Sequence, residues 1–145
     1  MVLRLVPARA ASAPLDPCTV LRVAGADHLL GGQTRARPAE RRASTPGPTC
    51  ALDRRDGSSA ISLMLVAPPG GAAYIDTARG EAQASRRLKI EDEPALGAGA
   101  FSGASGWTID VVALKRGTAM ILKFEALGAE RVEVRRFVQR VFDAL

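Results

Sequence analysis

The chain has few of the residues that carry most enzyme chemistry. Its 145 residues include one histidine, His28, and two cysteines, and aromatic residues make up 4%. A single histidine without an identifiable nucleophile or partner carboxylate is more typical of a structural residue than of a general base. One histidine and two cysteines with no CxxC pair also fall short of the about four ligands of a structural zinc site. The sequence therefore predicts no catalytic centre, no metal site and no cofactor.

Long hydrophobic runs are also missing. The longest apolar stretch is AISLMLVA at 60–67, whereas a membrane-spanning helix needs about 20 apolar residues. The sequence therefore predicts no transmembrane segment. A chain of this length is typical of a single domain with a sizeable apolar core.

The N-terminus has part of the pattern of a secretory signal. Arg4 and Arg9 flank a short apolar stretch, and the small residues ASA at 11–13 precede Pro14, as they do near a cleavage site. The apolar stretch is too short for a complete signal peptide. We therefore expect residues 1–15 to be the remnant of a signal peptide or a disordered tail, followed by one domain over 16–145.

Positive charge is concentrated in the first part of the chain. The net charge is +5, and residues 1–43 hold seven arginines against three carboxylates. The segment TRARPAERRASTPGP at 34–48 is typical of a solvated loop. Nucleic-acid binding is disfavoured because no aromatic residues alternate with these cations. A possible polyanion site in this segment comprises Arg35, Arg37, Arg41 and Arg42.

The two cysteines, Cys18 and Cys50, are an even number in a chain with signs of export. A disulfide is therefore the natural prediction. Closing a loop of this size stabilises a fold by roughly 3–4 kcal/mol in the chain-entropy model. A lipid anchor on Cys18 is the weaker alternative, because Leu15-Asp16-Pro17 stands where lipoprotein signals place small residues.

Hydrophobic periodicity predicts five structural units. A helix over 18–30 begins after Asp16-Pro17 and ends at Gly31-Gly32. A hairpin then turns at Asp56-Gly57 and pairs Leu52 with Ile61 and Cys50 with Leu63. The remaining units are a helix at 71–86, a hairpin of strands 106–114 and 118–126, and an amphipathic helix at 129–145 with Val134, Phe137, Val138, Val141, Phe142 and Leu145 on its apolar face. The acidic, proline-containing residues 90–101 are predicted to form a connection. The predicted fold is α+β, an antiparallel sheet with helices on one face in the order helix-hairpin-helix-hairpin-helix.

The glycine-rich stretch ALGAGAFSGASGW at 95–107 invites comparison with phosphate-binding loops. The dinucleotide fingerprint requires a third glycine at position 102, which is serine, and a helix directly afterwards. Because TIDVV at 108–112 has the pattern of a strand, we predict a glycine-enabled turn that places Phe101.

Four short pieces occur here in a familiar order, namely Pro17-Cys18, Leu29-Leu30-Gly31, Cys50, and Leu96-Gly97 with Ala100-Phe101. Together they resemble a broad family of small exported bacterial domains of unknown function, often found as lipoproteins. The resemblance covers about residues 16–145. Ala98 stands where that family usually has aspartate, and Arg22 and Gly25 replace a hydroxyl and an acidic residue. The resemblance implies an extracytoplasmic location and a Cys18–Cys50 bridge, and it brings no catalytic residues.

Three functions follow as hypotheses. The first is a non-catalytic exported module, periplasmic or extracellular, that binds a protein or a cell-envelope component. The second is a polyanion-binding protein that uses the Arg35–Arg42 segment. The third is a small hydrolase with Asp53, Asp110 or Glu125 as acids, which a pocket joining Asp110 or Glu125 to His28 would favour.

Overall fold

The computed structural model describes residues 15–37 and 46–145. In these ranges the protein forms four α-helices, one short 3-10 helix and seven strands. The helices are α1 (Pro17–Val23), α2 (Ala26–Leu29), α3 (Gly70–Ala84), η1 (Pro94–Leu96) and α4 (Arg131–Asp143). The strands are β1 (Thr34–Arg37), β2 (Thr49–Arg54), β3 (Ala60–Val66), β4 (Lys89–Asp92), β5 (Phe101–Ser105), β6 (Thr108–Lys115) and β7 (Thr118–Glu125).

All seven strands belong to one antiparallel sheet in the order β1-β2-β3-β7-β6-β5-β4. The predicted α+β class with an antiparallel sheet is confirmed. The predicted hairpin register is confirmed as well, since Leu52 pairs with Ile61 and Cys50 with Leu63. β3 and β7 are neighbours along their whole lengths, so the first and second halves of the chain meet in the middle of the sheet.

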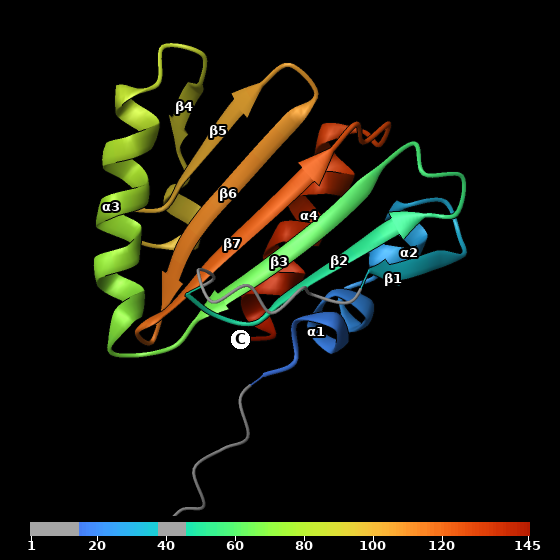
Figure 1. The fold of residues 1–145 in the computed structure, drawn as a ribbon, viewed down its shortest axis with the longest axis horizontal. Coiled ribbons are helices and arrows are strands. Elements are labelled where there is room, and N and C mark those ends of the chain that lie inside the picture. The colour runs from blue at the N-terminus through green and yellow to red at the C-terminus, as the bar shows by residue number, and fades with distance from the viewer. Residues whose placement is uncertain (1–14, 38–45) are drawn as a thin grey trace, which may run out of the picture.

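Helices cover both faces of the sheet (Figure 1). We call the face that carries Cys50 and Leu122 the disulfide face, where α1, α2 and α4 pack over the larger core. The opposite face, with Val66 and Val112, is covered in part by α3, the one described helix on this side, and we call it the α3 face. The prediction of helices on one face only was therefore wrong. The central strands are apolar on both faces, a pattern that requires a cover on each side.

The predicted element order was also incomplete, because it lacked β1, β4 and β5. β1 and β4 are the two edge strands of the sheet, with four residues each, and their side chains are mostly exposed. Short, charged edge strands give little hydrophobic alternation. Residues 90–101, predicted as a connection, in fact contain part of β4, η1 and the start of β5.

The predicted helix over 18–30 is interrupted. Asp16 caps α1 by accepting a hydrogen bond from the Cys18 amide, as its helix-start chemistry suggested. Gly25 then has φ 95°, a left-handed conformation that glycine adopts without steric cost, and α2 starts anew after it. The other helices lie close to their predicted positions, α3 at 70–84 and α4 at 131–143.

The glycine-rich stretch forms a turn that leads into β5. Gly97 and Gly99 have φ values of 96° and 79°, and Phe101 is buried. Arg79 of α3 fixes this turn, because its guanidinium donates hydrogen bonds to the Gly99 carbonyl and to Asp92 and lies 5.5 Å from the centre of the Phe101 ring. The stretch continues as a strand rather than as a helix, in agreement with the predicted structural turn.

Candidate functional site

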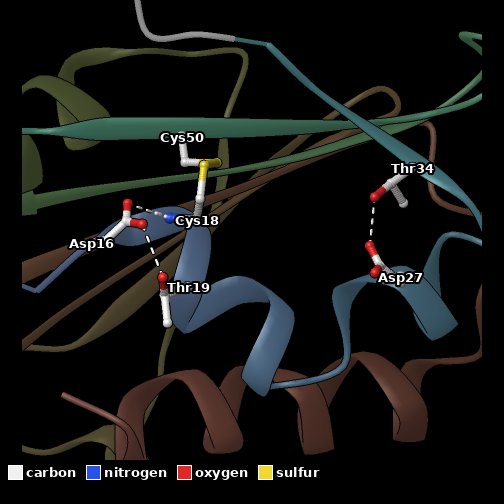
Figure 2. The surroundings of a disulfide bond; sticks show 6 residues. All are labelled: Asp16, Cys18, Thr19, Asp27, Thr34 and Cys50. Atoms are coloured by element: carbon white, nitrogen blue, oxygen red, sulfur yellow. Dashed lines mark hydrogen bonds between the residues drawn. A yellow bond between two sulfur atoms is a disulfide. The ribbon is translucent and has the colours of Figure 1, made fainter.

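The predicted disulfide between Cys18 and Cys50 is confirmed. It joins α1 to β2 on the disulfide face, as Figure 2 shows. The two Cα atoms are 5.2 Å apart, within the usual range for a disulfide. Nearby, the Thr34 hydroxyl donates a hydrogen bond of 2.5 Å to Asp27, which ties α2 to the start of β1. The bridge therefore anchors the N-terminal helices to the sheet.

The predicted polyanion segment lies only partly in the described structure. Arg37 on β1 makes an ion pair with Asp53, with 2.7 Å between Nε and Oδ2. Arg35 borders a shallow depression near Asp27 and Gln33. Arg41 and Arg42 lie outside the described residues, so the four arginines as a polyanion site stay a prediction. The expectation for residues 1–15 falls outside the described residues too, apart from Leu15.

The three carboxylates considered for a hydrolase share the α3 face. The strand registers place Asp53, Asp110 and Glu125 on this face, where they form a polar region next to Lys123. His28 is exposed on α2, and α2 packs against the disulfide face. The structure therefore does not bring His28 together with Asp110 or Glu125, and the arrangement expected of the hydrolase is missing from the described residues.

Asp110 has an unusual environment even so. Its Oδ1 atom is buried and has no hydrogen-bond partner among the described residues. This burial raises the pKa of the Asp110 carboxyl, Lys123 on the neighbouring strand lowers it, and Glu125 raises it. A buried carboxylate without a hydrogen-bond partner lowers the stability of the folded protein.

A partly enclosed cleft lies on the disulfide face. It lies between α4 and the sheet at β4, β5 and β6, and it encloses about 280 Å³. α4 packs against the middle of the sheet, where the Phe137 ring meets the Phe124 ring edge-to-face at 5.9 Å between centroids. The sheet extends past this contact to β5 and β4, and no helix of residues 15–37 and 46–145 covers the outer part of this face, which creates the cleft.

Apolar side chains form the floor and inner wall of this cleft. Strand residues of the floor include Ala104, Ile109 and Val111, and α4 contributes Val134 and Val138 to the wall. The remaining apolar lining residues are Ala95, Leu96, Phe124, Leu127 and Ala129. Ile109 is 39% exposed, which is high for a large aliphatic residue on a sheet face. Concave, mainly apolar surfaces of about this size are typical of small-molecule sites.

Polar groups line the rim of the cleft on both sides. On the sheet side, Lys89 makes an ion pair with Glu91 at 3.5 Å, and the Ser102 hydroxyl donates a hydrogen bond of 2.9 Å to Glu93. On the helix side, the polar residues are Arg131, Arg135 and Gln139, spaced four apart along α4. This spacing places them on one face of a helix. The cleft is thus an apolar groove between two polar edges.

Sequence reasoning did not identify this cleft. It correctly placed Val134 and Val138 on the apolar face of the last helix, and both line the cleft. The opposite wall consists of β4 and β5, which the sequence did not predict. Ile90 and Phe101, the apolar residues at the two ends of the predicted connection, were the only sequence pattern that indicated β4 and β5. Two isolated apolar residues are too few to distinguish strands from a connection.

The described residues hold neither a candidate metal site nor a candidate membrane-spanning helix. Within residues 15–37 and 46–145, no three side chains of histidine, cysteine, aspartate or glutamate gather as a metal site would require. In the same ranges, none of the helices has the length and apolar character needed to cross a membrane.

Comparisons with known proteins add no assignment. The chain matches no family model, no curated protein and no solved structure. The resemblance to small exported bacterial domains therefore stays an expectation, and the function must be argued from the chain itself.

Proposed function

We propose that this protein is a non-catalytic, exported binding module whose cleft between α4 and β4–β6 holds the apolar part of a cell-envelope component. The observation that carries the proposal is the apolar floor of the cleft, on which Ile109 remains 39% exposed. Burying apolar surface on binding contributes roughly 25 cal/mol per Å², and an open aliphatic floor offers this gain to a ligand.

Export is supported by the disulfide. Disulfides persist in oxidising compartments and are rare in the reducing cytosol, and the Cys18–Cys50 bridge is formed here. The N-terminal residues with signal-like composition point in the same direction. A non-catalytic role is supported by the separation of His28, on the disulfide face, from Asp110 and Glu125 on the α3 face.

The test is the binding of N-phenyl-1-naphthylamine, a neutral apolar dye whose fluorescence rises in apolar surroundings. We expect saturable enhancement with the wild-type protein. Ala104→Phe, which fills the cleft from β5, should weaken binding at least tenfold. The matched control is Ser105→Phe, because the next residue on the same strand faces the α3 side, and it should leave binding unchanged.

A second variant guards against misfolding of the first. Ala95 is exposed at the cleft rim, so Ala95→Phe obstructs the cleft without disturbing the core. The proposal is wrong if the folded wild type shows no saturable enhancement, or if Ser105→Phe weakens dye binding as much as both cleft variants do.

A further inference from the structure

Two arginines on the helix side of the cleft lack the partners that the other charged residues of the cleft have. On the sheet side, Glu91 is paired with Lys89 and Glu93 accepts a hydrogen bond from Ser102. Among the described residues, neither Arg131 nor Arg135 takes part in an ion pair or a side-chain hydrogen bond. The lining of the cleft therefore has satisfied carboxylates along one edge and two unpaired guanidinium groups along the other.

The position of Arg131 on α4 is unfavourable for the helix. It is the first residue of α4, which has Glu130 at its N-cap position without a side-chain cap hydrogen bond and Glu133 in its first turn. A cation near a helix N-terminus opposes the helix dipole, whereas an anion there is stabilised. Arg135 lies one turn further on the same face and also lines the cleft. An anionic group bound between these residues would contact two guanidinium groups beside the first turn of α4, where the helix dipole also favours negative charge.

Resting on the proposed function, we propose that the ligand is a single-chain anionic amphiphile. Its apolar chain lies on the aliphatic floor near Ile109 and Val138, and its carboxylate or phosphate group lies between Arg131 and Arg135. Guanidinium groups bind both kinds of anion through charge-assisted, often bidentate hydrogen bonds. The volume of about 280 Å³ is at the low end of ligand pockets, which favours one chain over a lipid with several.

The charge balance of the cleft separates this ligand from a cationic or neutral one. Its lining holds three cations, Lys89, Arg131 and Arg135, and two carboxylates. Because Glu91 is paired with Lys89 and Glu93 accepts a hydrogen bond from Ser102, these carboxylates attract a cationic head group less strongly than the two guanidinium groups attract an anionic one. An anionic head group displaces only water.

The experiment measures displacement of N-phenyl-1-naphthylamine by three amphiphiles with the same chain length, the two anions below their micelle concentrations and the alcohol below its solubility limit. These are dodecanoate, dodecyl phosphate and dodecan-1-ol. For the wild type, we expect at least one of the two anions to compete about tenfold more strongly than the alcohol, because charge-assisted hydrogen bonds are stronger than neutral ones. Comparison of the two anions identifies the preferred head group.

The double substitution Arg131→Gln/Arg135→Gln should abolish this preference by weakening anion binding about tenfold while leaving dodecan-1-ol unchanged. Arg136→Gln is the matched control, because Arg136 is an exposed arginine on the same helix that does not line the cleft. It should keep the wild-type preference.

Two results would overturn the inference while leaving the proposed function intact. The first is that all three amphiphiles displace the dye from wild-type protein equally well. The second is that the preference for anions survives in the double variant. If the dye itself does not bind the wild type, or is insensitive to both cleft-filling variants, the proposed function fails, and this inference fails with it.

Discussion

The two faces of the sheet are covered in different ways. The disulfide face is covered by three helices, one of which is bonded to the sheet through Cys18–Cys50. It holds the larger core, which includes both rings of the Phe124–Phe137 pair. Among the described residues, the α3 face has one helix, a smaller core around Ile75 and Val112, and the polar region around Asp110. The cleft lies on the better-supported face. A rigid scaffold around a partly uncovered apolar surface is the arrangement that a preformed binding site needs.

The largest effect should come from the core of the disulfide face. Phe137 is fully buried, so Phe137→Ala should destabilise the fold by about 3–5 kcal/mol, measured by urea unfolding. Ile75→Ala, in the smaller core, should cost less, close to 2 kcal/mol, the lower end of the range for large-to-Ala changes. Val132 is 55% exposed on the same helix as Phe137, and Val132→Ala is the control. A greater loss from Ile75→Ala would reverse the comparison of the two faces.

Loss of the disulfide should come next. The bridge spans 32 residues, and opening a loop of this length costs roughly 3–4 kcal/mol in the chain-entropy model. Chemical unfolding of Cys18→Ala/Cys50→Ala and of the reduced wild type should show similar losses. Equal stability of oxidised and reduced protein would mean that the N-terminal helices are held by packing alone.

On the α3 face, two glycines of the same helix should respond in opposite ways. A Cβ on Gly71 would lie 2.1 Å from the Gly117 carbonyl oxygen and 2.8 Å from the Ala119 nitrogen, whereas a Cβ on Gly80 would meet open space. Gly71→Ala should therefore destabilise the fold by about 1–3 kcal/mol through overpacking. Gly80→Ala should stabilise it by up to about 1 kcal/mol. Thermal unfolding of both variants tests how closely α3 approaches the β6–β7 turn, and destabilisation by Gly80→Ala would contradict it.

The smallest effect on stability should come from Asp110, in the polar region of the α3 face. The raised pKa of Asp110 means that the folded protein binds its proton more tightly than the unfolded chain does. Its favourable contribution is thus present below the unfolded pKa, near 3.8, and is lost as the pH rises through the folded pKa. Asp110→Asn should stabilise the protein at pH 7, and the gain should shrink as the pH falls toward 3.

Unfolding midpoints between pH 3 and pH 7 measure this difference. Asp76→Asn, at an exposed position of α3, is the control and should show no comparable gain. If Asp110→Asn destabilises the protein at pH 7, the Asp110 carboxylate has a favourable partner, and the α3 face is better satisfied than its hydrogen bonds indicate.

The same contrast explains what the sequence could predict. The disulfide face was largely predictable. Alternation within β2 and β3 identifies the strand residues that share a buried face, and the helical spacing of Phe137 and Val141 identifies the buried face of α4. The α3 face was not, because Met64 and Ile121 fall on the side that a one-sided sheet would expose, yet both pack against α3. Alternation tells which residues share a face, but not whether a helix from elsewhere in the chain covers the second face.

The cleft was beyond sequence reasoning for a related reason. One of its walls is formed by short strands whose charged and glycine-rich residues resemble a loop, and its opening depends on where α4 stops covering the sheet. That boundary is set by the tertiary contact between Phe124 and Phe137, not by any local pattern.

The most direct test of the cleft as a binding site is a titration of ¹⁵N-labelled protein with dodecanoate, followed by amide chemical shifts. The account predicts saturable shifts in β4, β5 and the first two turns of α4, with α3 unaffected. Shifts concentrated in α3 and the polar region around Asp110, or no saturable shifts at all, would contradict it.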